Sequence, residues 1–288
     1  MNYDLSMTVK PQTADGYESE ALSHVRATCL YMATVLGDLA DDRLVIVGGL
    51  VPQLIMPSDA DEPHVGTHDL DLGLSLALLE TEQYHEVAAR LRGAGFAPDQ
   101  NGDGRLTRQR WLAPERAGAR VRVDFLIPPP PSAANPMHQG GRILGLEADF
   151  AAYVIPGLEL AWRDRIPVTI SGQTLLGERA TRTVWVCGPG AFLVLKALAF
   201  SDRGEPKDAY DLYYVARNYG AGPHEIANAL LSLRDHPLAN KAIEILRRDF
   251  MDVENVGPHR VGAFLRRSDE DLRADVVAFI GEVVRLTA

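Results

Sequence analysis

The chain has 288 residues, of which 46% are hydrophobic and 24% charged, so it can bury a sizeable core and is not a disordered protein. Its formal net charge of -10 excludes a broad basic surface, and any contact with a polynucleotide must come from local patches. Two cysteines are too few for a disulfide framework or a zinc site of their own, and they suit a reducing cytoplasm.

The first part of the chain predicts alternating helices and strands. Residues 1–15 are polar and lack the apolar segment of a signal peptide, and no later run reaches the roughly 18 apolar residues of a membrane span. We therefore expect a cytoplasmic protein without membrane contact. Apolar residues at helical spacing predict an amphipathic helix over residues 18–39. A short buried strand at residues 44–47 ends at Gly48 and Gly49, and a short helix over residues 50–56 follows.

Residues 67–76 alternate strictly between apolar and polar, which predicts a half-buried strand. Its apolar face carries His68 and leucines, and its other face carries Asp69 and Asp71. Beyond it the sequence favours a helix at 78–91, antiparallel strands at 105–111 and 119–127, a proline-rich mobile loop at 128–141, and short strands at 166–170 and 183–186.

After Gly188-Pro189-Gly190 the chain favours helices only. They are expected at residues 191–200, 207–218, 223–233, 239–250 and 270–286. We therefore predict an α/β (α+β) fold, with a mixed-sheet domain over residues 1–187 and a helical C-terminal domain over residues 188–288.

Asp69 and Asp71 form the first candidate site. Residues two apart on a strand point the same way, so the two carboxylates lie side by side and repel unless a cation separates them. Two Mg²⁺ ions about 3.5–4 Å apart are the usual device for displacement at phosphorus. Taken alone, Asp-x-Asp is more often an ordinary solvated strand face.

The Gly48-Gly49 turn strengthens the metal interpretation. Glycines between a buried strand and a helix expose backbone N–H groups, which attract phosphate and let it approach closely. A tight turn that needs positive φ would explain the pair equally well in isolation. The order of strand, Gly-Gly, helix, loop and Asp-x-Asp strand is rarely supplied by chance.

Asp124 shares the polar face of its strand with Arg122. If that strand lies beside the Asp69/Asp71 strand, three carboxylates converge, and one can hold metal and help deprotonate an attacking hydroxyl. An exposed or salt-bridged aspartate remains the alternative.

Lys196 lies on an otherwise apolar helix, where an unpaired ammonium would be costly. It needs a carboxylate or a phosphate, and Asp211 is a natural orienting partner. Asp208 and Asp211 lie one above the other on the next helix, which Pro206 begins. Both aspartates could instead be first-turn residues favoured by the helix dipole.

These motifs resemble the DNA polymerase β-type nucleotidyltransferase superfamily, and within it the AbiE-type (type IV toxin–antitoxin) nucleotidyltransferase toxins. The first family motif falls on Gly48, Gly49, Asp69 and Asp71. The second falls on Lys196, Arg203, Lys207, Asp208, Asp211 and Leu212. One departure is Gly49, which replaces the usual small polar residue and removes a hydroxyl from the phosphate cradle.

The resemblance implies a polymerase β-like core that moves a nucleoside monophosphate from an NTP to an acceptor hydroxyl. Asp69, Asp71 and Asp124 would hold two Mg²⁺ ions, and Lys196, positioned by Asp211, would grip the triphosphate. The glycines, with Arg203, Lys207 and Asp208, would complete the nucleotide site. It further implies an RNA acceptor such as the 3′ end of tRNA, toxicity, and a cognate antitoxin.

Two alternatives stay open. The same chemistry could act on a small molecule, as in aminoglycoside nucleotidyltransferases, and the acidic net charge suits a cationic acceptor. A non-catalytic nucleotide-binding protein could also keep the fold. His64 and His68 lack a third metal ligand at suitable spacing and are interpreted as packed histidines. The pair Arg266-Arg267 is interpreted as solvated, with contact to a polynucleotide backbone as the alternative.

Overall fold

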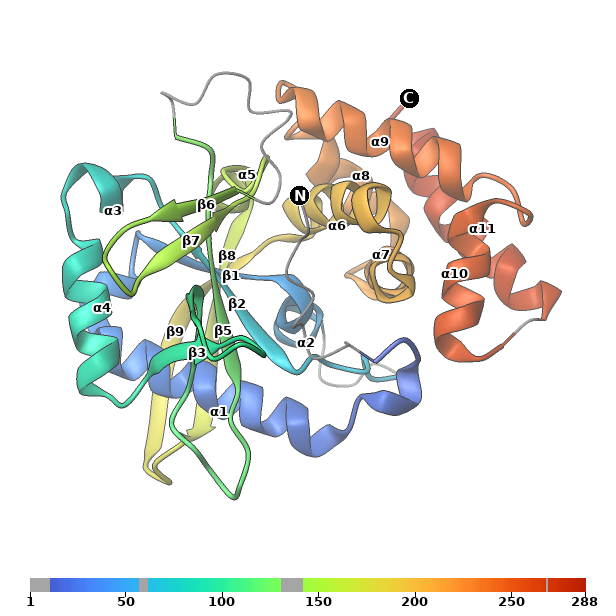
Figure 1. Cartoon of the computed structure of the whole chain (residues 1–288). Helices are drawn as coiled ribbons and strands as arrows, with labels where there is room; N and C mark the ends of the chain where they lie inside the picture. The colour runs from blue at the N-terminus through green and yellow to red at the C-terminus, as the bar shows by residue number, and fades with distance from the viewer. Residues whose placement is uncertain (1–10, 57–61, 131–141, 268) are drawn as a thin grey trace.

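The computed structural model describes residues 11–56, 62–130, 142–267 and 269–288. Strands gather on one side of the molecule and the C-terminal helices on the other (Figure 1). Most of the loop expected at residues 128–141 lies outside the described residues, so its mobility stays a prediction.

A mixed sheet forms the first part of the molecule. Its strands are β1 (Leu44–Val47), β2 (Asp69–Leu74), β3 (Ala97–Gln100), β4 (Leu106–Leu112), β5 (Arg122–Ile127), β6 (Arg142–Gly145), β7 (Ala151–Val154), β8 (Arg165–Gln173) and β9 (Arg179–Cys187). In the described residues these nine strands run in the order β3-β4-β5-β2-β1-β9-β8, with β7 paired to β5 and β6. Because β2 is antiparallel to β1 and parallel to β5, the expected mixed sheet is confirmed.

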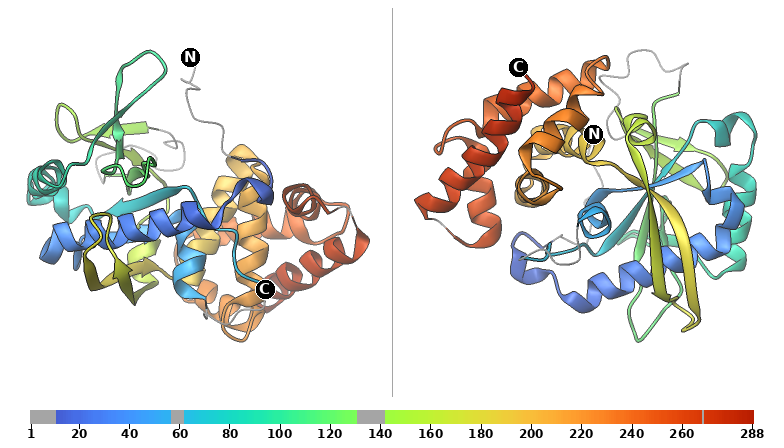
Figure 2. Two further views of the ribbon diagram at one scale, coloured as in Figure 1. Left: turned by 90° about the horizontal axis from the view of Figure 1, so that it is seen from below. Right: turned by 180° about the vertical axis from the view of Figure 1, so that it is seen from behind.

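Helices cover the sheet. α1 (Ser19–Leu36) packs against β8 and β9, and it is buried on all sides between Ala27 and Ala33 (Figure 2). The single helix predicted at residues 78–91 is wrong: α3 (Ala77–Glu80) and α4 (Tyr84–Gly93) are separate, because Glu82 between them has a positive φ of 54°. Short helical segments also occur: η1 (Ala14–Gly16), η2 (Gly37–Ala40), η3 (Gly48–Leu50), α2 (Val51–Ile55) and α5 (Leu160–Arg163).

Only helices follow β9 in the described part of the chain, as expected. They are α6 (Pro189–Arg203), α7 (Pro206–Asn218), α8 (Pro223–Leu231), α9 (Pro237–Phe250), α10 (Val256–Leu265) and α11 (Glu270–Leu286). α6 is central and packs against α7, α8 and α9. Proline at the start of α6 to α9 suits the first helical turn, where an N–H has no intrahelical partner.

α6 joins the helical part to the sheet. The buried side chains of the two parts form one continuous core, to which β9 and α6 both contribute. The N-terminus of α6 is capped from the sheet side, where Ala191 N donates to Asp164 Oδ2 at 2.8 Å. Among the described helices, none is both long and apolar enough to cross a lipid bilayer.

The crossing of α6 and α8 predicts a stability effect. A Cβ on Gly190 would lie 2.8 Å from the carbonyl carbon of Ala229, and a backbone atom cannot rotate away. Gly190→Ala should therefore lower the free energy of unfolding by about 1–2 kcal/mol, measured by urea titration. Gly93→Ala is the matched control, because no atom lies within 4 Å of its Cβ position. Equal stability of the two variants would contradict this packing.

Candidate active site

The turn after β1 lies against the second aspartate of β2. Val47 pairs with Asp71, so the next residue, Gly48, meets the Asp71 side chain. Gly48 has a φ of 69°, in the left-handed region that glycine tolerates. A Cβ there would also overlap Asp71 Oδ2. Both backbone strain and steric conflict therefore require glycine, and the missing side chain lets the carboxylate lie on the turn.

The three aspartates of the predicted metal site lie on neighbouring strands. In the parallel β2–β5 pair, Asp69 lies opposite Arg122 and Asp71 lies opposite Asp124. Residues directly opposite on adjacent strands point to the same face, as do residues two apart on one strand. Asp69 and Asp124 are each only 6% exposed, whereas Asp71 is half-buried.

Asp124 is bound by an arginine that the sequence analysis missed. Arg110 lies opposite Asp124 in the antiparallel β4–β5 pair. Its Nε and Nη2 donate to the two carboxylate oxygens of Asp124 at 2.6 and 2.7 Å. These bonds, opposed by burial and helped by the charge of Asp69, raise the pKa of Arg110. The alternative of a salt-bridged strand aspartate therefore describes Asp124 in this structure.

The three aspartates expected to bind metal lie on neighbouring strands, but they do not form a three-ligand site in this structure. In the residues that the structure describes, no three His, Cys, Asp or Glu side chains are placed to hold one metal ion. Asp124 is adjacent as predicted, but Arg110 takes up its oxygens. Asp69 and Asp71 still fit Mg²⁺, which prefers oxygen donors and often combines one or two carboxylates with substrate phosphates.

A buried ion network lies at the facing ends of α6 and α7. Lys196 Nζ lies 2.9 Å from Asp208 Oδ1 and 2.6 Å from Asp211 Oδ2. Arg203 donates two further bonds to Asp208, and Lys207 Nζ donates to Asp211 Oδ1 at 2.8 Å. The predicted partnership of Lys196 and Asp211 is therefore present, but Lys196 also pairs with Asp208.

The network keeps its charges although it is buried. Burial lowers the pKa of Lys196, but the attraction of Asp208 and Asp211 outweighs it and raises the value overall. Burial alone would raise the pKa of Asp211, whereas Lys196, Lys207 and His64 hold it well below its usual value. Lys196 and Asp211 are therefore both charged at neutral pH.

Lys207 is the cation nearest the glycine turn. Its Nζ lies 3.7 Å from the position that a Cβ on Gly49 would take, and 5.3 Å from the ring centroid of Tyr17. Burial and repulsion by Lys196 lower the pKa of Lys207 despite its bond to Asp211. An anion beside Lys207 would favour its charged form.

Electrostatics also connect the helices to the aspartates of β2. The pKa of Arg203 is lowered by burial and raised more strongly by Asp208, and the charge of Asp71 raises it further. The glycine turn, the β2 aspartates and the cations of α6 and α7 therefore lie in one region between the sheet and the helical part.

His64 belongs to this region, and the sequence analysis did not assign it a role there. It is buried between Tyr210 and Tyr214, as a packed histidine should be. Nε2 lies 2.8 Å from Asp211 Oδ1, and Gly66 N donates to Nδ1 at 3.1 Å. A neutral ring with its proton on Nε2 satisfies both bonds, and burial lowers the pKa of His64 to about 4. No motif in the sequence signalled this contact.

The predicted position of His68 is wrong. It was expected on the buried face of a strand, but β2 begins only at Asp69. The His68 ring is half-buried against Tyr17, with 4.9 Å between ring centroids. Tyr17 also contacts Phe264 of α10 at 5.8 Å, so an aromatic cluster borders the site.

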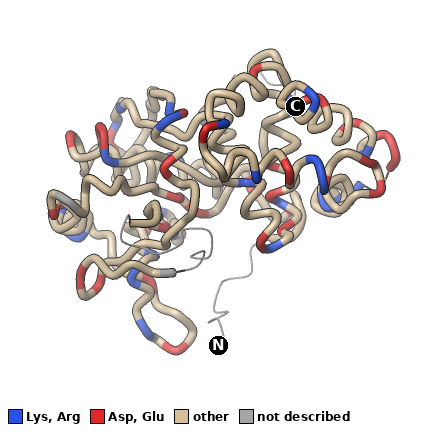
Figure 3. The backbone as a smooth tube through the Cα atoms, turned by 90° about the horizontal axis from the view of Figure 1, so that it is seen from above, with Lys and Arg blue, Asp and Glu red and all other residues tan. Residues whose placement is uncertain are grey.

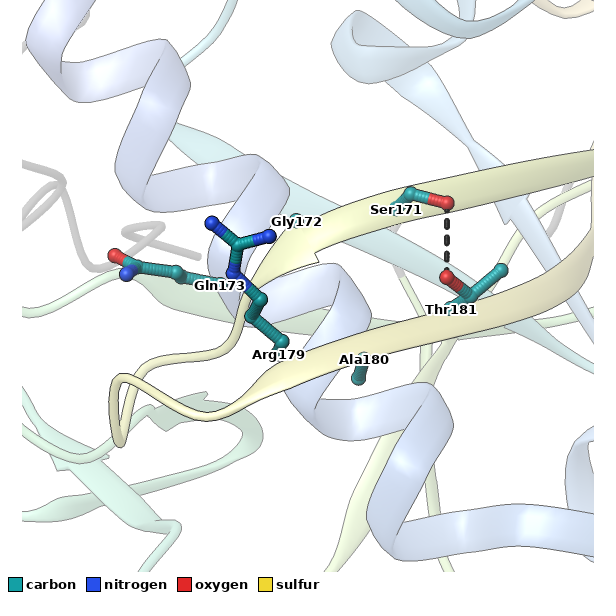
Figure 4. Close-up of a pocket in the computed structure, with 6 residues that line it drawn as sticks. All are labelled: Ser171, Gly172, Gln173, Arg179, Ala180 and Thr181. Carbon is teal, nitrogen blue, oxygen red and sulfur yellow. Dashed lines mark hydrogen bonds between the residues drawn. The ribbon is translucent and has the colours of Figure 1, made fainter.

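A hollow of about 550 Å³ lies elsewhere, on the β8–β9 hairpin (Figure 4). It is lined by short polar residues such as Ser171 and Thr181, whose hydroxyl oxygens lie 3.0 Å apart. It contains none of the charged residues described above, and we assign the chemistry to the region around Asp71 and Lys207.

The family of the chain follows from a comparison with family models. The model described as "Nucleotidyl transferase AbiEii toxin, Type IV TA system" matches residues 66–287. The chain belongs to this family. It is therefore a nucleotidyltransferase of the toxin type, as the motifs indicated. The match includes the three aspartates and the α6–α7 ion network. It begins after the Gly48-Gly49 turn, and the turn is connected to the site by its contact with Asp71 in the fold.

Comparison with solved structures adds little. The crystal structure of an antigenic nucleotidyltransferase-like protein from Paracoccidioides brasiliensis is similar over 77% of this AbiEii-family chain and 93% of that chain. The sequence identity is 16% and the TM-score 0.38, too low to support an argument. None of the curated proteins matches the chain.

The neutral state of His64 predicts a pH dependence of stability. Its pKa of about 4 in the fold lies below the ordinary value of 6.5, so between these pH values only the unfolded chain binds the proton. The stability contributed by His64 is present above pH 6.5 and is lost as the pH falls towards 4, by up to about 1.4 kcal/mol per pH unit.

His64→Gln keeps an N–H donor for Asp211 but does not titrate. Urea unfolding between pH 4.5 and 7.5 should therefore show a shallower acid loss in this variant than in the wild type. Identical pH profiles would mean that His64 takes up its proton equally in the folded and unfolded chain.

Proposed function

We propose that this AbiEii-family protein transfers a nucleoside monophosphate from an NTP to an acceptor hydroxyl and releases pyrophosphate. The observation that carries the proposal is the meeting of two acidic strand residues, Asp69 and Asp71, with a glycine turn that has the ammonium of Lys207 beside it. Acidic residues that suit Mg²⁺ then face a cation that suits phosphate.

Each group has a distinct part in this proposal. Asp69 and Asp71 would hold Mg²⁺, with two ions as the working number, and the metal would neutralise the charge that develops on the phosphates. Lys207 and the backbone of Gly48 and Gly49 would bind the triphosphate. Lys196 would act mainly by holding Asp208 and Asp211 in place.

The acceptor oxygen would form a bond to the α-phosphorus, and the bond from that phosphorus to the β-phosphate oxygen would break. The proton of the acceptor hydroxyl would pass to a carboxylate, for which Asp124 is the candidate. Arg110 must first release an oxygen of Asp124. A guanidinium binds phosphate and carboxylate with the same forked geometry, so an incoming phosphate can compete for it.

We propose RNA as the acceptor, on the basis of an arginine-lined hollow in the helical part. The hollow, of about 310 Å³, lies at the end of α10, and His259, Arg266, Arg267 and Arg273 contribute to its lining. Arg266 and Arg267 are also paired with nearby acids, Asp15 and Asp269. In the view of Figure 3, basic and acidic residues are interspersed over both parts, so RNA would meet local patches.

The remaining parts of the proposal concern organisation and partners. We take residues 1–187 as the nucleotidyltransferase core and residues 188–288 as the part that completes the cleft. Membership of a type IV toxin family supports a cognate antitoxin. A cytoplasmic location is supported by Cys29 and Cys187, which are free and buried.

A labelling experiment tests the function. Purified protein is incubated with total RNA, Mg²⁺ and each α-labelled NTP in turn, and at least one NTP should label RNA. Asp69→Asn and Asp71→Asn should each reduce labelling by ~100-fold or more, because the metal supplies several kcal/mol of charge stabilisation. Asp103→Asn, an exposed change in the β3–β4 hairpin, is the matched control and should be fully active.

The outcomes separate the parts of the proposal. Labelling of an aminoglycoside but of no RNA would replace the RNA acceptor by a small molecule. Full activity of Asp71→Asn would remove the metal site. Growth arrest on expression, relieved by Asp69→Asn, would connect the reaction to toxicity.

The two lysines should behave differently. Lys196→Met leaves buried carboxylates with fewer partners and should cost about 3 kcal/mol of unfolding free energy. Lys207→Met leaves Asp211 paired with Lys196 and His64, so stability should change by only about 1 kcal/mol, while the KM for NTP rises about tenfold. Urea unfolding and NTP titration measure both. A stable Lys196→Met variant with a raised KM would instead make Lys196 the triphosphate ligand.

A further inference from the structure

Thr67 lies where a side chain at position 49 would point. A Cβ built on Gly49 would lie 2.8 Å from both Cβ and Oγ1 of Thr67, closer than non-bonded atoms approach. Gly49, unlike Gly48, does not have a positive φ, so its backbone would accept another residue. Contact with Thr67, rather than backbone strain, therefore excludes a side chain from position 49.

The Thr67 hydroxyl also lies in the right chemical setting for an anion. The same Cβ position is 3.7 Å from Lys207 Nζ, so hydroxyl and ammonium border one small volume beside the Gly49 backbone. The approach is narrow, because Thr67 is only 7% exposed and the Tyr17 ring lies over Lys207. Of the parts of a nucleotide, the phosphate oxygens carry the negative charge that suits a hydroxyl and an ammonium donor.

The Thr67 hydroxyl is not committed elsewhere by strong bonds. Its Oγ1 donates to Asp69 O at 3.2 Å and accepts from Asp69 N at 3.3 Å. Hydroxyl bonds are usually about 2.7–2.8 Å long, so the bond that uses the Thr67 proton is weak. Turning this proton towards a charged phosphate oxygen would exchange a long bond for a charge-assisted one.

We infer that Thr67 supplies the side-chain hydroxyl of the phosphate cradle, in place of a polar residue at position 49. The inference rests on the proposed NTP-dependent transfer and names a further residue of the same site. Positions 49 and 67 then exclude each other: the hydroxyl comes from one or from the other, because both side chains cannot fit.

Four variants test this exchange. Thr67→Val removes the hydroxyl at nearly constant shape and should weaken binding of each Mg²⁺–NTP about tenfold, whereas Thr67→Ser should keep it. Gly49→Ser should be impaired, because it collides with Thr67. The double variant Gly49→Ser/Thr67→Gly returns a hydroxyl from the other position and should bind within about threefold of the wild type.

Binding is measured by calorimetry with each of the four NTPs and with inorganic tripolyphosphate, without an acceptor. The contact is to phosphate, so Thr67→Val should lose the same factor with every ligand. A loss confined to one NTP would overturn the inference in favour of a base contact. Urea unfolding of each variant shows that it is folded under the assay conditions.

A purely structural role of Thr67 predicts another pattern. If the residue only positions Asp69, Thr67→Val should lower kcat with little change in binding, and a serine at position 49 should not restore it. That result would overturn the inference and leave the proposed function standing. If the wild-type protein binds no NTP and no tripolyphosphate, the proposed function and the inference fail together.

Discussion

The buried carboxylate of Asp211 holds the candidate site together. It accepts bonds from Lys207 and His64 and lies 2.6 Å from the Lys196 ammonium. His64 comes from the segment before β2, and the lysines come from α6 and α7, so one group connects the sheet side to the helical part. An isolated buried carboxylate would be costly, and its three partners make it tolerable while fixing where they lie.

This arrangement separates charge across the site. On the helical side, Lys196, Arg203 and Lys207 pair with Asp208 and Asp211. The sheet side presents Asp69 and Asp71. In the proposed reaction, Asp69 and Asp71 would hold the metal, and Lys207 would bind the phosphates of the nucleotide. Burial, together with repulsion by Lys196, lowers the pKa of Lys207 within this arrangement.

The sequence predicted the strands and helices that carry the motifs but only part of the contacts between them. Alternation placed Asp124 on a strand, and the structure puts that strand beside β2. The pairing of Asp124 with Arg110 could have been anticipated, since their two strands were expected to be antiparallel. The contact of His64 with Asp211 spans 147 positions and leaves no local pattern. The helix α10 was not predicted, because Gly257, Pro258 and Gly262 are residues that disfavour a helix. In the structure Gly257 permits close packing, since a Cβ there would overlap the Phe250 ring.

The two glycines of the turn are required for different reasons, although they form one motif in the sequence. Gly48 is required by its backbone conformation and by Asp71, so it depends on the metal-binding strand. Gly49 is required by the side chain of Thr67, which lies two residues before Asp69. A change at position 71 therefore bears on position 48, and a change at position 67 bears on position 49. The turn and the strand therefore form one steric unit.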